Sequence, residues 1–142
     1  KAALEIGKRM FSQSTGEKIK MRSSRDFFEL FSPFLRNLKK EVVKVALLDP
    51  KMNLIKERTV SEGSLNVSIV HLREVMIPAI KESAAAIALV HNHPSGDPMP
   101  SQQDIEITHR ISKTGQIIGI KLADHVIIGG ETYYSFSDEG LL

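Results

Sequence analysis

The residues whose types and spacing could do chemistry lie between positions 91 and 104. His91 and His93 end an apolar run, and in a strand two such residues point to the same face. A turn rich in proline and glycine follows, and then Ser101 and Asp104 stand at a predicted helix start. Two imidazoles and one carboxylate are the ligand pattern of catalytic zinc, in which a fourth position is left for water. Zinc lowers the pKa of that water from about 15.7 towards about 7, so hydroxide becomes available at neutral pH.

Each of these residues also has an ordinary structural interpretation. A His-x-His pair often occurs without a metal, Ser101 is a good helix N-cap, and Asp104 is typical of a capping box. Asp97 is a further possible ligand, although Gly96-Asp97-Pro98 is typical of a turn first. The combination favours a metal site, because one strand–loop–helix junction holds all of the candidates.

Apolar periodicity and chain breakers predict the elements that must position this junction. Helices are predicted over 2–11, from Ser24 until Pro33 disturbs or ends the helix, over 71–83, and over 101–114 with an end near Gly115. Strands are predicted over 41–48, 53–60, 65–70, 84–90, 116–122, 124–129 and 132–136. The unbroken apolar run at 84–90 is typical of a central strand buried on both faces. Antiparallel hairpins with helices between them indicate an α+β or mixed α/β fold.

Length and composition exclude several classes of protein. The 142 residues predict one domain, and the absence of cysteine excludes a Cys-ligated zinc site, a thiol nucleophile and a disulfide framework. We expect a cytoplasmic protein without membrane contact, because no apolar stretch reaches roughly 18 residues and no signal peptide is recognisable. Because the chain begins at Lys1 rather than Met, we also expect a fragment of a longer protein.

Charge is distributed unevenly along the chain. Residues 1–60 hold 14 Lys/Arg and 7 Asp/Glu, whereas residues 61–142 hold 5 Lys/Arg and 10 Asp/Glu. The net charge is therefore +7 in the first segment and −5 in the second. A basic segment can bind nucleic acid, but its ordinary interpretation is a solvated surface. No aromatic ladder interleaves with the basic residues, so stacking on single-stranded nucleic acid is not indicated.

The spacing from His91 to Asp104 resembles the JAMM motif, His-x-His-x7-Ser-x2-Asp, of MPN/JAB-domain metalloproteases. The longer run His-Asn-His-Pro-Ser-Gly-Asp-Pro-x-Pro-Ser-x-x-Asp, followed by Leu122-Ala-Asp-His-Val-Ile-Ile-Gly129, resembles the bacterial RadC family. The resemblance covers roughly residues 40–138. It implies an amino-terminal linker and helices over 1–39 and a JAB/MPN domain over 40–142. The implied fold is a cytidine-deaminase-like sandwich in which helices flank a central mixed sheet.

The resemblance implies a role for five residues. His91, His93 and Asp104 would bind one Zn²⁺ per chain, and Ser101 would help to stabilise the oxyanion. An upstream glutamate would act as general base, taking a proton from water and passing it to the leaving amine. Glu41 matches that place best, with Glu57 and Glu62 as rivals. Relatives cleave peptide or isopeptide bonds, including bonds to ubiquitin-like tags, which implies a substrate of that class.

Three hypotheses follow for the function. The first is a zinc-dependent metallopeptidase or isopeptidase-like hydrolase of the JAMM type. The second takes up the DNA-repair label that the RadC name carries: a DNA-repair-associated protein acting as a nucleic-acid-binding or metal-dependent nuclease domain, supported by the basic amino-terminal part. The third is a non-catalytic scaffold, against which the complete ligand set argues. The natural substrate and the oligomeric state are left open by the sequence.

Overall fold

The computed structural model describes residues 17–63 and 72–142. The helix predicted over 2–11 and the strand predicted over 65–70 lie outside these residues. The described elements are, in chain order, α2 (Ser24–Leu35), β1 (Glu41–Leu48), β2 (Leu54–Gly63), α3 (Leu72–Lys81), β3 (Ala86–Asn92), α4 (Gln102–Ile118), β4 (Lys121–Gly129) and β5 (Thr132–Ser135).

The described strands form one mixed sheet in the order β2-β1-β3-β4-β5. The pair β3–β4 is parallel, and the other three neighbouring pairs are antiparallel. The parallel pair requires a crossover connection, which α4 supplies between β3 and β4. A mixed α/β fold with a central mixed sheet flanked by helices is therefore confirmed.

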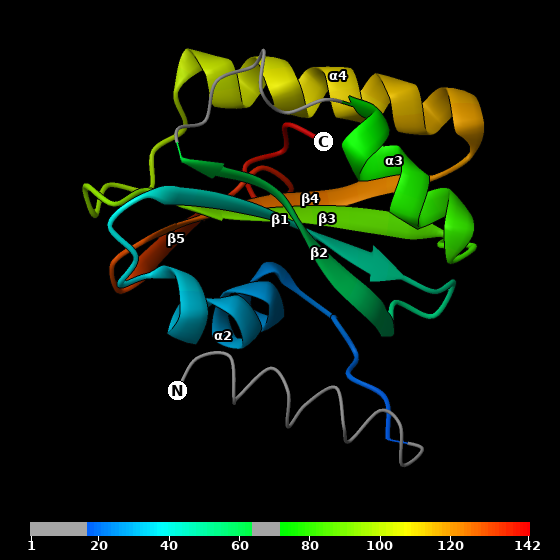
Figure 1. Cartoon of the computed structure of the whole chain (residues 1–142), viewed down its shortest axis with the longest axis horizontal. Coiled ribbons are helices and arrows are strands. Elements are labelled where there is room, and N and C mark those ends of the chain that lie inside the picture. Colours follow the sequence, from blue (N-terminus) through cyan, green and yellow to red (C-terminus); the bar gives the residue numbers. More distant parts are fainter. Residues whose placement is uncertain (1–16, 64–71) are drawn as a thin grey trace.

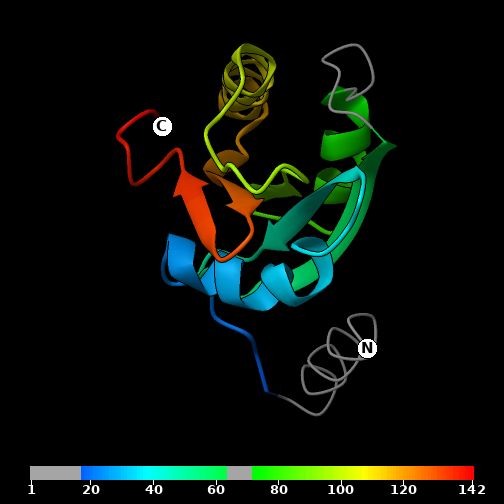
Figure 2. The ribbon, with the colours of Figure 1, turned by 90° about the vertical axis from the view of Figure 1, so that its left-hand side faces the viewer.

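Helices cover both faces of this sheet (Figures 1 and 2). Buried residues of α3 and α4 pack against one face together with Val45, Leu47 and Leu89. Buried residues of α2 pack against the opposite face together with Ala46, Leu48 and Ala88. Successive residues of β1 and β3 therefore contribute to different cores, which explains why both strands read as nearly continuous apolar runs.

Strand β3 is buried over its whole length, which confirms the central strand predicted from the apolar run. It lies two residues further along the chain than predicted, over 86–92 rather than 84–90. The antiparallel register pairs Val45 with Leu89 and Val43 with His91. His91 is consequently a residue of the strand itself, and its backbone is held by neighbours on both sides.

The prediction that α4 ends near Gly115 and that a strand covers 116–122 was wrong. The helix continues to Ile118 and ends at Gly119, whose φ of +81° is the left-handed conformation that glycine adopts at helix ends. Gly115 has a different function within the helix, because a Cβ there would lie 2.1 Å from the backbone oxygen of Ile120. The glycine lets the chain turn back closely against the helix before β4 begins at Lys121.

The cap of α2 differs from the prediction, and of the two effects predicted for Pro33 an early end of the helix is excluded. Ser23, rather than Ser24, is the N-cap, and the Asp26 carboxylate accepts the Ser23 N–H at 3.2 Å. Pro33 does not end the helix, which continues to Leu35. Because Pro33 lies exposed in the last turn, its missing N–H leaves only one intrahelical hydrogen bond unmade.

Among residues 17–63 and 72–142, no helix is both long and apolar enough to cross a membrane. The division of the chain between residues 39 and 40 stays a prediction.

Candidate metal centre

The two histidines lie where β3 leaves the sheet. His91 is in the strand, His93 follows directly after it, and their Nε2 atoms are 3.1 Å apart. The side chain of His91 is fully buried, and that of His93 is 12% exposed. A buried central strand thus delivers both imidazoles to one point at its carboxyl end, as their spacing predicted.

The carboxylate of Asp104 reaches the same point from the first turn of α4. Its Oδ2 lies 3.2 Å from His93 Nε2, and its Oδ1 lies 3.3 Å from His91 Nε2. Asp104 is also the capping-box residue, because Oδ2 accepts the backbone N–H of Ser101 at 2.7 Å. The cap interpretation of this residue is therefore confirmed, and the cap aims the carboxylate at the histidines, whereas its role as a metal ligand stays a prediction.

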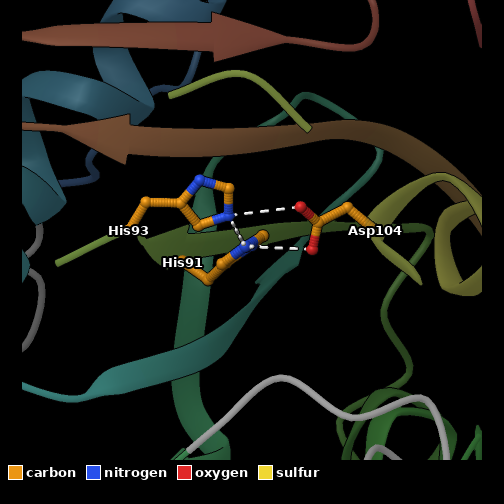
Figure 3. Close-up of side chains that lie close together, drawn as sticks. All are labelled: His91, His93 and Asp104. Atoms are coloured by element: carbon orange, nitrogen blue, oxygen red, sulfur yellow. Dashed lines mark hydrogen bonds and ion pairs between the residues drawn. The ribbon is translucent and has the colours of Figure 1, made fainter. Parts of the chain in front are cut away.

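These three side chains could hold a metal ion (Figure 3). One ligand atom from each lies within 4.8 Å of the others. Asp104 Oδ1 is buried, yet among the described residues it has no hydrogen-bond partner. A buried carboxylate oxygen without a partner is costly in a folded protein, and a cation between the three groups would remove that cost.

The electrostatics of the cluster favour a positive charge at its centre. Burial alone would raise the pKa of Asp104, but the imidazoles of His91 and His93, whose Nε2 atoms lie 3.3 and 3.2 Å from its two oxygens, outweigh burial and hold the pKa well below its usual range. Burial would likewise lower the pKa of His93, but its hydrogen bonds to Asp104 and to the Asp97 carbonyl outweigh burial and raise that pKa. The carboxylate is ionised at neutral pH, and either a proton on His93 or a metal ion balances its charge.

The outer nitrogen of each histidine has a partner of its own. His93 Nδ1 lies 2.8 Å from the backbone oxygen of Asp97, and His91 Nδ1 lies 2.7 Å from Nε2 of His125. Because a carbonyl only accepts, His93 donates through Nδ1, so its Nε2 lone pair faces the cluster whenever the ring is neutral. Such outer hydrogen bonds are typical of histidines that bind metals.

Of the three candidate glutamates, Glu41 is the one that shares a sheet face with the histidines. Its Oε1 lies 3.9 Å from His93 Nε2, and its side chain is 24% exposed. The β1–β3 register, continued by two residues beyond the Val43–His91 pair, sets Glu41 opposite His93. An acidic side chain therefore stands at the solvent side of the cluster.

The rivals Glu57 and Glu62 belong to the opposite face. They pair across β1 and β2 with Ala46 and Val42, whose side chains pack in the core beside α2. Directly opposed residues of neighbouring strands point to the same side of a sheet. Glu57 is also held by the Lys44 ammonium at 3.0 Å.

Ser101 lies beside the cluster, whereas the side chain of Asp97 turns away from it. The Ser101 hydroxyl accepts the Asp104 N–H at 3.1 Å, which leaves its own hydrogen to be donated elsewhere. Asp97 Oδ1 accepts the backbone N–H of Met99 at 3.0 Å. The turn interpretation of Asp97 is correct, and its contribution to the centre is its backbone oxygen.

Sequence reasoning missed two residues that lie outside the centre and hold parts of it in place. His125 on β4 bonds His91, and Asn92 accepts the backbone N–H of Val42 at 2.8 Å, next to Glu41. A polar residue within an apolar strand was the available signal for His125. Thr108, which shares the helix face of Ser101 and Asp104, bonds His125 in turn.

A family model described as "RadC-like JAB domain" matches residues 21–141. Among curated relatives, the UPF0758 proteins of Trichlorobacter lovleyi and Pelobacter propionicus are each 49% identical over 142 residues, or 100% of this chain. The UPF0758 protein of Methanococcoides burtonii is 45% identical over 141 residues, or 99% of this chain. The chain spans 62% of the length of each of these three relatives.

Proposed function

This chain belongs to the RadC-like JAB domain family, as its motifs predicted, and from that premise we propose that it is a zinc-dependent metallopeptidase or isopeptidase of the JAMM type. The observation that carries the proposal is the convergence of two imidazoles and one ionised carboxylate at a point beside Glu41. Three nitrogen and oxygen ligands with an open side are the donor set that catalytic zinc prefers. The substrate class is a peptide or isopeptide bond.

The chemistry proposed for the site divides between the ion and the protein. A zinc ion held by His91, His93 and Asp104 would supply a Lewis acid and bring the pKa of water towards about 7. Glu41 accepts a proton from the attacking water and returns it to the leaving amine as the C–N bond breaks. The Ser101 hydroxyl donates to the oxyanion that develops on the carbonyl oxygen, and one such donor is typically worth about 3–4 kcal/mol.

Metal analysis of purified protein tests the proposed site. We expect about one zinc per chain in the wild type and close to none in His91→Ala. His109→Ala serves as the matched control, because His109 is an exposed histidine of α4, and its zinc content should equal that of the wild type. Equal zinc in wild type and His91→Ala would contradict the site.

Cleavage of a peptide library that includes isopeptide-linked members tests the proposed reaction. Products from the wild type that are absent with His91→Ala support a hydrolase. Zinc binding without any cleavage would argue for a metal site that is not a peptidase.

The nucleic-acid alternative stays a prediction that rests on the charge of residues 1–60. Among the described residues of that part, four basic side chains form ion pairs, which reduces the free positive charge: Arg25 with Glu29, Arg36 with Glu131, Lys44 with Glu57, and Lys56 with Glu82. Binding to duplex DNA that falls steeply with salt and is lost when Lys39 and Lys40 are neutralised would support it.

A further inference from the structure

A buried chain of hydrogen bonds lies behind His91, on the side away from Asp104 and His93. Nδ1 of His91 contacts Nε2 of His125 at 2.7 Å, and Nδ1 of His125 contacts Oγ1 of Thr108 at 2.5 Å. Thr108 Oγ1 in turn donates to the backbone oxygen of Asp104 at 2.6 Å. His91, His125 and Thr108 are each at most 2% exposed, so water does not compete for these bonds.

The direction of this chain is set at its Thr108 end. A backbone carbonyl only accepts, so the single hydroxyl hydrogen of Thr108 is used on Asp104. The hydroxyl oxygen must then accept from His125, which places a hydrogen on His125 Nδ1.

His125 lies in surroundings that disfavour a charged ring. It is 1% exposed and stacks on Phe136 with ring centroids 4.9 Å apart. Its two ring nitrogens bond His91 and Thr108 and not a carboxylate, so no ion pair offsets the cost of burying a charged ring. In a neutral imidazole one nitrogen donates and the other accepts, so His125 Nε2 accepts, and the hydrogen between the two rings belongs to His91 Nδ1.

We propose that Thr108 and His125 are positioning residues that hold His91 as the Nδ1–H tautomer, with the lone pair of Nε2 directed at the metal site. If the hydrogen bonds ran in the opposite direction, a hydrogen would lie on His91 Nε2 and this atom could not bind a metal. For His93, the backbone oxygen of Asp97 favours the Nδ1–H tautomer in the same way as His125 does for His91. The inference rests on the metal site of the proposed function but not on hydrolysis.

The tautomer can be observed directly, without metal and without a substrate. In ¹⁵N-histidine-labelled, metal-free protein at neutral pH, the nitrogen shifts and couplings of His91 should identify Nδ1 as the protonated nitrogen. Protonation of His91 on Nε2 would overturn the proposal, whether or not the protein cleaves peptides.

Three substitutions on α4 separate the hydrogen-bond chain from general effects on the helix. Thr108→Val keeps the side-chain shape but loses the hydroxyl, so His91 should show a mixture of tautomers. Its zinc dissociation constant, measured by chelator competition, should rise about 10–100-fold. Thr108→Ser restores the hydroxyl and should return both properties to nearly wild-type values.

The matched control is Thr114→Val, because the Thr114 hydroxyl also donates to the carbonyl four residues earlier, that of Arg110, at 2.9 Å, but Thr114 is only half-buried. This variant should bind zinc as the wild type does.

Folded Thr108→Val with wild-type zinc affinity would overturn the proposal. If Thr108→Val does not fold, the tautomer of His91 measured in the wild type decides whether the proposal holds. A wild type that binds no zinc but shows the Nδ1–H tautomer would contradict the proposed function and leave the hydrogen-bond chain standing.

Discussion

The side-chain oxygen of Asn92 accepts the backbone N–H of Val42 at 2.8 Å, and its amide nitrogen donates to the backbone oxygen of Lys40 at 3.0 Å. These two backbone groups stand on either side of Glu41, the first residue of β1. Asn92 itself lies between the two histidines of the metal centre. Asn92 therefore holds the start of β1, which carries the Glu41 side chain, in place.

Asn92→Ala should reduce catalysis more than it reduces metal binding. The change leaves the buried backbone N–H of Val42 without a partner, at about 1–3 kcal/mol, removes the bond to the carbonyl of the exposed Lys40, and releases the strand around Glu41. We expect a lower kcat at nearly unchanged zinc content, measured on protein shown to be folded by circular dichroism. Asn53→Ala is the control, since Asn53 is also a buried, hydrogen-bonded asparagine but lies in the β1–β2 turn. An equal loss of kcat in both variants would refute a role in placing Glu41.

Glu41→Gln should abolish cleavage while the protein keeps its fold and its zinc. Glutamine has nearly the same shape but cannot accept the proton, and general-base catalysis is typically worth about 10²–10⁴-fold. Steady-state cleavage rates and zinc content are measured on the same preparation. Glu62→Gln provides the comparison, because Glu62 is exposed and belongs to the other face of the sheet. Activity retained in Glu41→Gln would exclude this residue as the base.

Two substitutions of Asp104 should separate its role as a ligand from its role as a helix cap. Asparagine keeps an oxygen for the Ser101 N–H but removes the negative charge, whereas alanine removes both. In metal-free protein, Asp104→Ala should lose about 1 kcal/mol more stability than Asp104→Asn, as measured by urea unfolding. Both variants should bind zinc poorly. Zinc binding by Asp104→Asn at wild-type strength would show that the carboxylate is only a cap.

The stability of metal-free protein and the stabilisation that zinc adds to it should change with pH in opposite directions. The pKa of His93 is raised above 6.5, so protonation of His93 stabilises the metal-free fold. That contribution is complete below about pH 6.5 and is lost as pH rises through the folded-state pKa. Thermal unfolding of metal-free protein should therefore show Tm falling over this range.

Zinc binding requires the unprotonated ring, so the increase in Tm on adding zinc should grow over the same pH range. His93→Ala should lack both trends. A metal-free His93→Ala variant with the wild-type slope would show that another group titrates.

The convergence of the three candidate ligands could be predicted from sequence because their order is local. His91 and His93 share a strand face by alternation, and a helix start brings Asp104 back to them after one short loop. The family resemblance already favoured Glu41 over Glu57 and Glu62, but its place on the same sheet face as the histidines follows from the register of β1 against β2 and β3, which spacing along the chain does not contain.

His125 was missed for a similar reason. It reaches His91 only because β4 pairs parallel to β3, after a helix that separates the two strands in sequence. The misplaced end of α4 has a different cause. Gly115 does not end the helix but allows the backbone of Ile120 to pack closely against it. Only the position of Ile120 in the structure distinguishes these two roles of a glycine.

Gly129 ties the end of β4 to the loop between the metal ligands. A Cβ at this position would lie 2.5 Å from the backbone nitrogen of Pro98 and 2.7 Å from the backbone oxygen of Gly96. The loop over 94–100 joins His93 to the helix start that carries Asp104, so it must move if Gly129 gains a side chain. Gly129→Ala should cost about 1–3 kcal/mol of stability and also raise the zinc dissociation constant.

Gly130→Ala distinguishes the effect on the loop from an effect on the turn. A Cβ at Gly130 meets open space, but its φ of +60° imposes left-handed strain of about 1–2 kcal/mol on alanine. The two variants should therefore lose similar stability in urea unfolding, while chelator competition should show weaker zinc binding only in Gly129→Ala. Unchanged zinc affinity in Gly129→Ala would mean that the ligands hold their geometry independently of the loop, through β3 and the cap of α4 alone.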